Sequence, residues 1–122
     1  MINVLLLDDD KNLVNTLSRI LKLNDCNVEQ ALTVSEAITK IESGNFNLLI
    51  ADYYLTDGTA ISILEKIKES GIEINSIIIS GMSDHEIKQA CIDAGADLFI
   101  EKPFKLQYFV ECITNLLEGR VE

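Results

Sequence analysis

Five short apolar runs alternate along the chain with five longer segments of helical periodicity, and this alternation restricts the fold more than any other feature. It is typical of α/β domains with a parallel sheet, because each parallel strand needs a crossover connection. The third and fourth runs are apolar throughout, as expected for central strands that helices cover on both faces. The predicted strands are residues 3–8, 26–31, 47–52, 76–80 and 97–102, and the predicted helices are residues 11–24, 34–43, 59–70, 84–94 and 105–118.

Local signals at the helix ends support these limits. Thr33 with Glu36, and Ser83 with Glu86, match the capping box that satisfies backbone N–H groups at a helix start. Four glycines fall where helices are expected to end in the left-handed conformation. These are Gly44, Gly71, Gly95 and Gly119, whereas Gly58 and Gly81 lie just past strand ends, at the sheet edge where ligands bind.

Composition narrows the class of protein. With 122 residues, 48% of them apolar, the chain is long enough for a hydrophobic core, and we expect one domain over residues 1–122. The net charge of −10, with no cluster of basic residues, argues against direct binding of nucleic acid.

No apolar run approaches the ~20 residues that span a bilayer, so we expect a soluble, cytoplasmic protein without membrane contact. The three separated cysteines fit reduced thiols better than disulfides or zinc ligands.

Polar side chains collect at the predicted carboxyl ends of four strands. They are Asp8, Asp9 and Asp10, then Asp52, Ser80 and Lys102. Because parallel strands end at one edge of the sheet, we expect these groups to lie together. Carboxylates ~4 Å apart repel by about 4 kcal/mol per pair at an effective dielectric of ~20, so a cation is needed, and Mg2+ suits oxygen ligands. Acids after a strand are also common helix caps, which explains Asp10 well but not Asp52.

Four motifs in order carry a resemblance to a known family. LLLDDDKNL, LLIADYYLTDG, IIISG and GADLFIEKPF together resemble the receiver domains of two-component response regulators, over the whole chain. The resemblance implies a flavodoxin-like, doubly wound sheet of five parallel strands in the order 2-1-3-4-5, with five helices. It also implies that Asp52 accepts a phosphoryl group from the phosphohistidine of a sensor histidine kinase or a histidine phosphotransfer protein.

The resemblance assigns the remaining site residues. Asp8, Asp9, Asp52 and the backbone carbonyl of Tyr54 would hold Mg2+, with Asp9 the closer of the acidic pair. Lys102 would bind the phosphoryl oxygens.

The resemblance further implies a switch, in which Ser80 hydrogen-bonds to the phosphoryl group and Phe99 changes rotamer. The face built from helix 84–94, strand 97–102 and helix 105–118 would then meet an effector domain or a second copy in a homodimer.

Some positions depart from the family pattern or are open to other interpretations. Thr56 stands where the family commonly has proline, and Tyr54 and Met82 occupy variable positions that influence the lifetime of the phosphoryl group. The resemblance implies a cis bond before Pro103, whereas only about 5–6% of such bonds are cis in general. We expect His85 to be solvated, and Tyr108 and Phe109 to pack along a helix face.

Three alternative functions compete with a phosphorylated receiver. A flavin-binding electron carrier needs a phosphate-binding loop before the first helix, where this chain has three aspartates. An aspartyl phosphatase would resemble Asp-x-Asp-x-Thr, and the second acid is missing after Asp52. An interaction module that never takes phosphate would not need the full set of acids, Ser80 and Lys102. We therefore expect a signalling phosphoprotein that promotes its own phosphorylation and is not a turnover enzyme.

Overall fold

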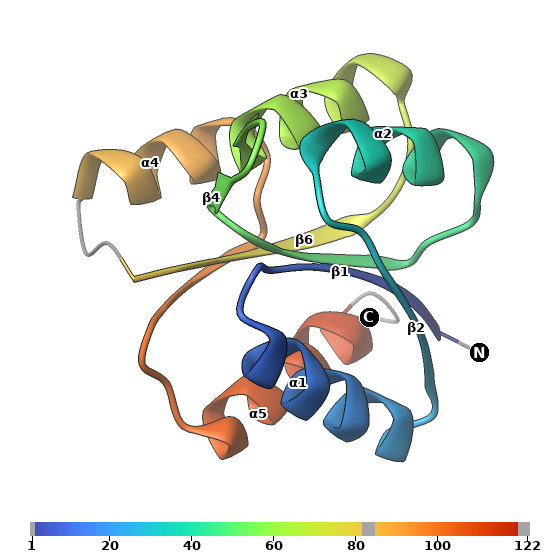
Figure 1. Ribbon diagram of the computed structural model, residues 1–122, viewed down its shortest axis with the longest axis vertical. Coiled ribbons are helices and arrows are strands. Elements are labelled where there is room, and N and C mark those ends of the chain that lie inside the picture. Colours follow the sequence, from blue (N-terminus) through green and yellow to red (C-terminus); the bar gives the residue numbers. More distant parts are fainter. Residues whose placement is uncertain (1, 82–84, 120–122) are drawn as a thin grey trace.

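The computed structural model describes residues 2–81 and 85–119, which form a three-layer α/β sandwich (Figure 1). The parallel sheet lies in the middle, with α2, α3 and α4 on one face and α1 and α5 on the other. Ser83, predicted to cap a helix, and Met82 lie outside the described residues. Within residues 2–81 and 85–119, no helix has the length and apolar character needed to span a bilayer.

The main sheet has the predicted topology. Its strands are β1 (Ile2–Leu7), β2 (Cys26–Gln30), β3 (Leu48–Asp52), β6 (Asn75–Ser80) and β7 (Leu98–Glu101). They are all parallel and run in the order β2-β1-β3-β6-β7, which is the order 2-1-3-4-5 of a doubly wound fold. The predicted flavodoxin-like fold is therefore confirmed, and every strand carboxyl end lies at the same edge.

The two faces of the sheet bury separate halves of the core. The helices are α1 (Lys11–Leu23), α2 (Val34–Ser43), α3 (Ala60–Ser70), α4 (His85–Asp93) and α5 (Leu106–Gly119). Alternate residues of β3 point to opposite sides, so Leu49 packs with the cluster under α2, α3 and α4. Ile50 packs with the cluster under α1 and α5, where Phe109 is fully buried as expected.

Several helix ends follow the predicted chemistry, and two do not. Thr33 caps α2 by accepting a hydrogen bond from the Glu36 N–H, and Gly71 ends α3 in the left-handed conformation with a φ of 67°. Gly44, by contrast, is extended, so its predicted left-handed role is wrong. Its lack of a side chain serves packing, because an added Cβ would lie 3.1 Å from both the Lys40 carbonyl oxygen and a Phe46 ring carbon. Gly119 is the last residue of α5 and does not lie beyond its end.

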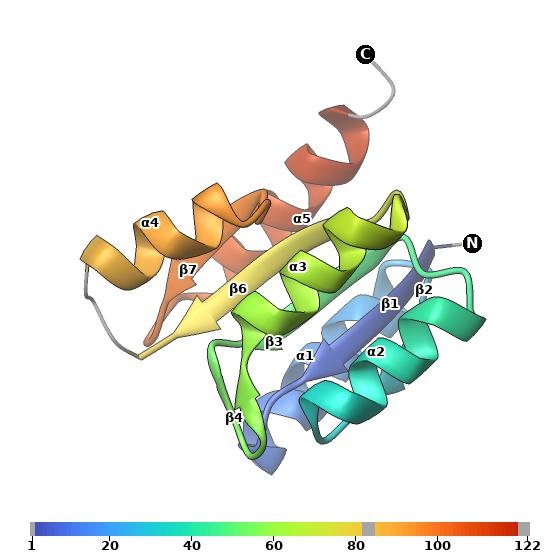
Figure 2. The same ribbon diagram turned by 90° about the horizontal axis from the view of Figure 1, so that it is seen from above.

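A two-stranded hairpin that was not among the predicted elements joins β3 to α3. It pairs β4 (Tyr54–Leu55) with the antiparallel β5 (Gly58–Thr59). The helix that follows begins at Ala60, one residue later than predicted, because Thr59 is extended and serves as its N-cap residue. The hairpin extends from the carboxyl end of β3 (Figure 2), so it lies directly beside the predicted site.

Candidate functional site

Three carboxylates meet at the carboxyl edge of the sheet. Asp8 directly follows β1, Asp9 comes next, and Asp52 is the last residue of β3. One oxygen of each carboxylate lies within 4.8 Å of the others. Asp8 is buried, Asp52 is half-buried and Asp9 is exposed, so the cluster opens to solvent on one side.

Lys102 supplies the positive charge of the cluster. Its Nζ donates a hydrogen bond to Asp8 Oδ2 at 2.9 Å and lies 3.7 Å from Asp52 Oδ2. The Lys102 backbone N–H donates to the Ser80 carbonyl at 2.8 Å, which fixes the chain just after β7. The bond between Lys102 and Pro103 is cis, as the family resemblance implied.

Asp10 has the alternative role, that of a helix cap. Its side chain accepts hydrogen bonds from the N–H groups of Asn12 and Leu13 at the start of α1. Its own N–H donates to Asp8 Oδ1 at 3.0 Å, so the cap also orients the buried carboxylate. These acids therefore have two uses: Asp10 caps the start of α1, whereas Asp8 and Asp52 lie beside Lys102.

The surroundings raise the pKa values of Asp52 and of Lys102. Burial, followed by the charge of Asp8, raises the pKa of Asp52, and the charge of Lys102 only partly offsets this. Burial alone would lower the pKa of Lys102, but the hydrogen bond to Asp8 and the charges of Asp8 and Asp52 outweigh it and raise that pKa. The site therefore holds a fixed ammonium group beside an excess of carboxylate.

This donor set fits Mg2+. Hard divalent ions prefer carboxylate and carbonyl oxygens, and Mg2+ is commonly held by one or two carboxylates with water in the remaining positions. The exposed side of the cluster, at Asp9, leaves room for such waters.

The backbone next to Asp52 is held on both sides. The Tyr53 N–H donates to the Ile79 carbonyl at 3.0 Å, and the Tyr53 carbonyl accepts from the Ala60 N–H at 2.9 Å. Tyr54 then enters the hairpin, where it pairs with Thr59. Its side chain is half-exposed and packs edge-on against the ring of Tyr53, with the centroids 4.8 Å apart.

The predicted switch residues lie on neighbouring strands. Ser80 ends β6 and is almost completely buried, and Phe99 on β7 is half-buried and packs against the core below α2, α3 and α4. Phe99 also borders an open groove between α4, β7 and α5, which Tyr108 lines as well. Tyr108 is half-exposed there and lines the groove, so of the two aromatics predicted to pack along a helix face only Phe109 is buried in the core. His85 is exposed at the start of α4, as predicted.

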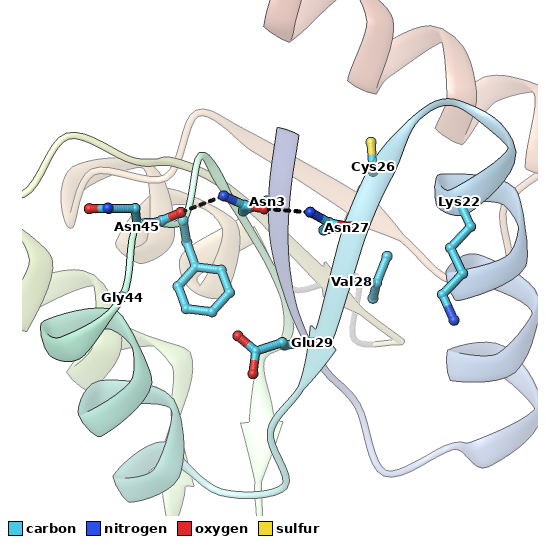
Figure 3. A pocket seen from close by; sticks show the side chains of 9 residues that line it. Asn3, Lys22, Cys26, Asn27, Val28, Glu29, Gly44 and Asn45 are labelled. Carbon is cyan, nitrogen blue, oxygen red and sulfur yellow. Dashed lines mark hydrogen bonds between the residues drawn. The ribbon is translucent and has the colours of Figure 1, made fainter. Parts of the chain in front are cut away.

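A hollow of about 560 Å3 lies at the opposite edge of the sheet, beside β2 (Figure 3). There the Asn27 amide donates to Asn3 Oδ1 at 3.1 Å, and the Asn3 amide donates to the Asn45 carbonyl at 3.0 Å. These polar groups satisfy one another and present no group of charges comparable to the acidic cluster. None of the predicted site residues lines this hollow.

One side chain of the hairpin has a contact that was not predicted from the sequence. Asp57, in the turn between β4 and β5, accepts hydrogen bonds from the N–H groups of Val34 and Ser35 at the start of α2. The Asp57-Gly58 dipeptide is a strong hairpin signal, and it could have predicted the turn. It could not have predicted the contact with α2.

Comparison with known proteins agrees with this geometry. Residues 4–114 match the family model of the response regulator receiver domain. The chain belongs to this family. Solved structures of receiver domains share its fold closely, including the CheY-like receiver domain protein of Methanospirillum hungatei. The two are 30% identical, with a TM-score of 0.89 over 98% of this chain and 95% of that one. The beryllofluoride-activated receiver domain dimer of NtrC4 is also 30% identical, with a TM-score of 0.90 over 98% of each chain.

The curated relatives are longer proteins. A cyclic di-GMP phosphodiesterase of Thermotoga maritima is 31% identical over 97% of this receiver domain, which spans 32% of that protein. The swarming motility regulation protein RssB of Serratia marcescens is 34% identical over 85% of this chain, and the match covers 48% of RssB. This receiver domain thus spans about half or less of the length of these relatives.

Proposed function

We propose that this receiver domain accepts a phosphoryl group on Asp52 from the phosphohistidine of a sensor histidine kinase or a histidine phosphotransfer protein. One observation carries the proposal: a half-buried carboxylate at the end of β3 lies 3.7 Å from a lysine ammonium and within 4.8 Å of two further carboxylates. Carboxylates beside such charges act as nucleophiles toward phosphorus. Membership in the family supports the donor class.

Asp8, Asp9 and Asp52, with the backbone carbonyl of Tyr54, would hold Mg2+. When bound, the ion offsets negative charge on the oxygens of the transferring group. Lys102 binds the same oxygens from the side of Asp8 and keeps its proton throughout, since its pKa is raised. Asp8 orients the ammonium group and, by accepting from the Asp10 N–H, is itself held by the backbone.

The transfer is a displacement at phosphorus. An Asp52 oxygen forms the new P–O bond, the P–N bond of the phosphohistidine breaks, and the imidazole nitrogen keeps the electron pair. The product is an acyl phosphate on Asp52, and no oxidant or second substrate is needed. Later attack of water on phosphorus restores the carboxylate, so the domain is a signal carrier and not a turnover enzyme.

The phosphorylated state would be transmitted through Ser80 and Phe99. A phosphoryl group adds about −1.5 to −2 charges, which draws the Ser80 hydroxyl toward it. Because Ser80 is almost completely buried, its movement leaves space beside β7 that Phe99 fills by rotating inward. The surface formed by α4, β7 and α5 then changes shape, and an effector domain or a second copy binds there.

Beryllofluoride with Mg2+ tests this function, because it mimics a phosphoryl group on a carboxylate. We expect it to shift the amide resonances of the β3, β6 and β7 ends in the wild type and to leave Asp52→Asn unchanged. Binding that persists in Asp52→Asn would move the acceptor to another residue. A wild type that does not respond at all would favour an interaction module that never takes phosphate.

A further inference from the structure

The hairpin next to the site is attached to a helix that is remote in sequence. At its turn, Asp57 Oδ1 accepts a hydrogen bond from the Val34 N–H at 2.7 Å, and Asp57 Oδ2 accepts one from the Ser35 N–H at 3.1 Å. These are the first two N–H groups of α2, which have no partner within the helix itself. A single carboxylate therefore holds the hairpin against the helix, although its two partners lie 23 and 22 residues before it in the sequence.

The start of α2 has two caps of different origin. Thr33, the residue before the helix, satisfies the third N–H by accepting from Glu36 at 3.0 Å. Asp57 satisfies the first two from the hairpin. The hydrogen bond from Val34, and to a smaller extent the one from Ser35, lower the pKa of Asp57 below its usual value. The carboxylate therefore stays charged next to the positive end of the α2 dipole.

The turn itself is exposed at Thr56, Asp57 and Gly58. Besides the Asp57 bonds, the hairpin is held by the two residue pairs of β4 and β5 and by Leu55, which packs against the core under α2, α3 and α4. Gly58 has a φ of 153°, a conformation that side chains disfavour, and an added Cβ there would lie 3.7 Å from Val34. The tip is thus shaped to approach the start of α2, and the Asp57 carboxylate makes that attachment.

The same hairpin carries the backbone of the site. The Tyr53 backbone is bonded to Ile79 and Ala60, which fixes the base of the hairpin to the sheet and to α3. Tyr54, whose carbonyl is the Mg2+ ligand in the proposed function, lies between this fixed base and the turn. With Asp57 attached to α2, the hairpin from Tyr53 to Thr59 is anchored both at its base and at its turn.

We propose that Asp57 is a positioning residue of the phosphoacceptor site, which holds the Tyr54 backbone in place by attaching the hairpin to α2. The proposal rests on the proposed function, since it takes the Tyr54 carbonyl as a ligand. Asp57 acts through the hairpin and does not itself bind the ion. If it were only a cap for α2, its loss would affect stability alone.

Two variants separate positioning from capping. Asp57→Ala removes both the cap and the attachment of the hairpin, whereas Thr33→Ala removes a cap from the same helix end and leaves the hairpin attached. Mg2+ affinity is measured by following amide resonances in a MgCl2 titration at constant ionic strength, and stability by urea denaturation of each protein without metal. Asp57→Asn, which keeps one oxygen able to accept from Val34, serves as the conservative variant.

Both alanine variants should lower the denaturation midpoint, and only Asp57→Ala should weaken Mg2+ binding. We expect a loss of about tenfold, at the lower end of the range found for residues that orient metal ligands. The Tyr54 and Leu55 amide resonances should shift in metal-free Asp57→Ala and not in Thr33→Ala, and Asp57→Asn should recover part of the affinity.

Wild-type affinity in Asp57→Ala, or an equal loss in Thr33→Ala, would overturn the positioning role. Either result would leave the proposed function intact, because the wild type would still bind Mg2+. A wild type that binds no Mg2+ would instead overturn both proposals.

Discussion

Replacing Asp52 by asparagine should stabilise the metal-free protein, although it removes the proposed acceptor. Asp52 repels Asp8 and Asp9, whose oxygens lie within 4.8 Å, by about 3.5 kcal/mol each at an effective dielectric of ~20. Its attraction to Lys102 at 3.7 Å is worth about 4.5 kcal/mol on the same scale. Repulsion therefore exceeds attraction by about 2.5 kcal/mol, and solvent on the open side reduces this to about 1–2 kcal/mol.

Thermal unfolding followed by circular dichroism, at pH 7 in EDTA, measures the effect. For a domain of this size, 1 kcal/mol corresponds to about 3–5 °C, so the midpoint of Asp52→Asn should rise by about 5 °C. Glu73→Gln is the matched control, because it removes one negative charge from an exposed loop and should change the midpoint by less than about 1 °C. Asp8→Asn should raise the midpoint by less than Asp52→Asn does, because the attraction of Asp8 to Lys102 at 2.9 Å, about 5.7 kcal/mol on the same scale, offsets more of its repulsion from Asp9 and Asp52.

The difference between the wild type and Asp52→Asn should also depend on pH. The pKa of Asp52 is raised in the folded protein, so the folded state binds this proton more tightly than the unfolded chain. As the pH falls from 7 toward 3.8, the ordinary pKa of an aspartate, Asp52 takes up a proton in the folded wild type and loses its charge. The wild type then gains the stability that Asp52→Asn already has, so the difference between their midpoints shrinks. A lower midpoint for Asp52→Asn than for the wild type in EDTA, or a difference that does not vary with pH, would refute this account of the electrostatics.

Three further predictions concern ion binding, hydrolysis and switching. Asp9→Asn should weaken Mg2+ binding by about tenfold or more in a metal titration, and an unchanged affinity would place the ion elsewhere. Tyr54→Asn should speed the release of phosphate several-fold, because a half-exposed aromatic side chain near the site hinders attacking water; an equal or slower rate would mean that Tyr54 leaves that path open. Ser80→Ala should still accept phosphate but lose most of the beryllofluoride-induced amide shifts around Phe99, and full wild-type shifts there would indicate another route of coupling.

The fold was predictable because its determinants are local or periodic. Runs such as the one ending at Asp52 are apolar throughout, which predicts strands buried on both faces, and the alternation with helices predicts parallel pairing. Parallel pairing then brings the strand ends together without further information, and Asp8, Asp52 and Lys102 do meet at that edge.

What sequence reasoning missed depends on contacts between distant segments. The hydrogen bond from Val34 to Asp57 joins residues 23 positions apart, and the sequence around either residue does not indicate that the two meet. Gly44 has the expected position after a helix, but crowding by the Lys40 carbonyl and the Phe46 ring, not a left-handed turn, accounts for it. The exposure of Tyr108 likewise follows from how α5 packs against the sheet, which places Phe109 in the core and its neighbour at the surface groove.

Direct localisation of the phosphoryl group tests the central claim. The wild type and Asp52→Asn are incubated with Mg2+ and either acetyl phosphate or a phosphohistidine donor, reduced with borohydride, digested and examined by mass spectrometry. We predict one acid-stable, alkali-labile acyl phosphate per chain before reduction. Borohydride converts it to homoserine, which should be found at position 52 of the wild type and be absent from the variant. Labelling of Asp52→Asn at the wild-type level would contradict the claim that this carboxylate is the acceptor.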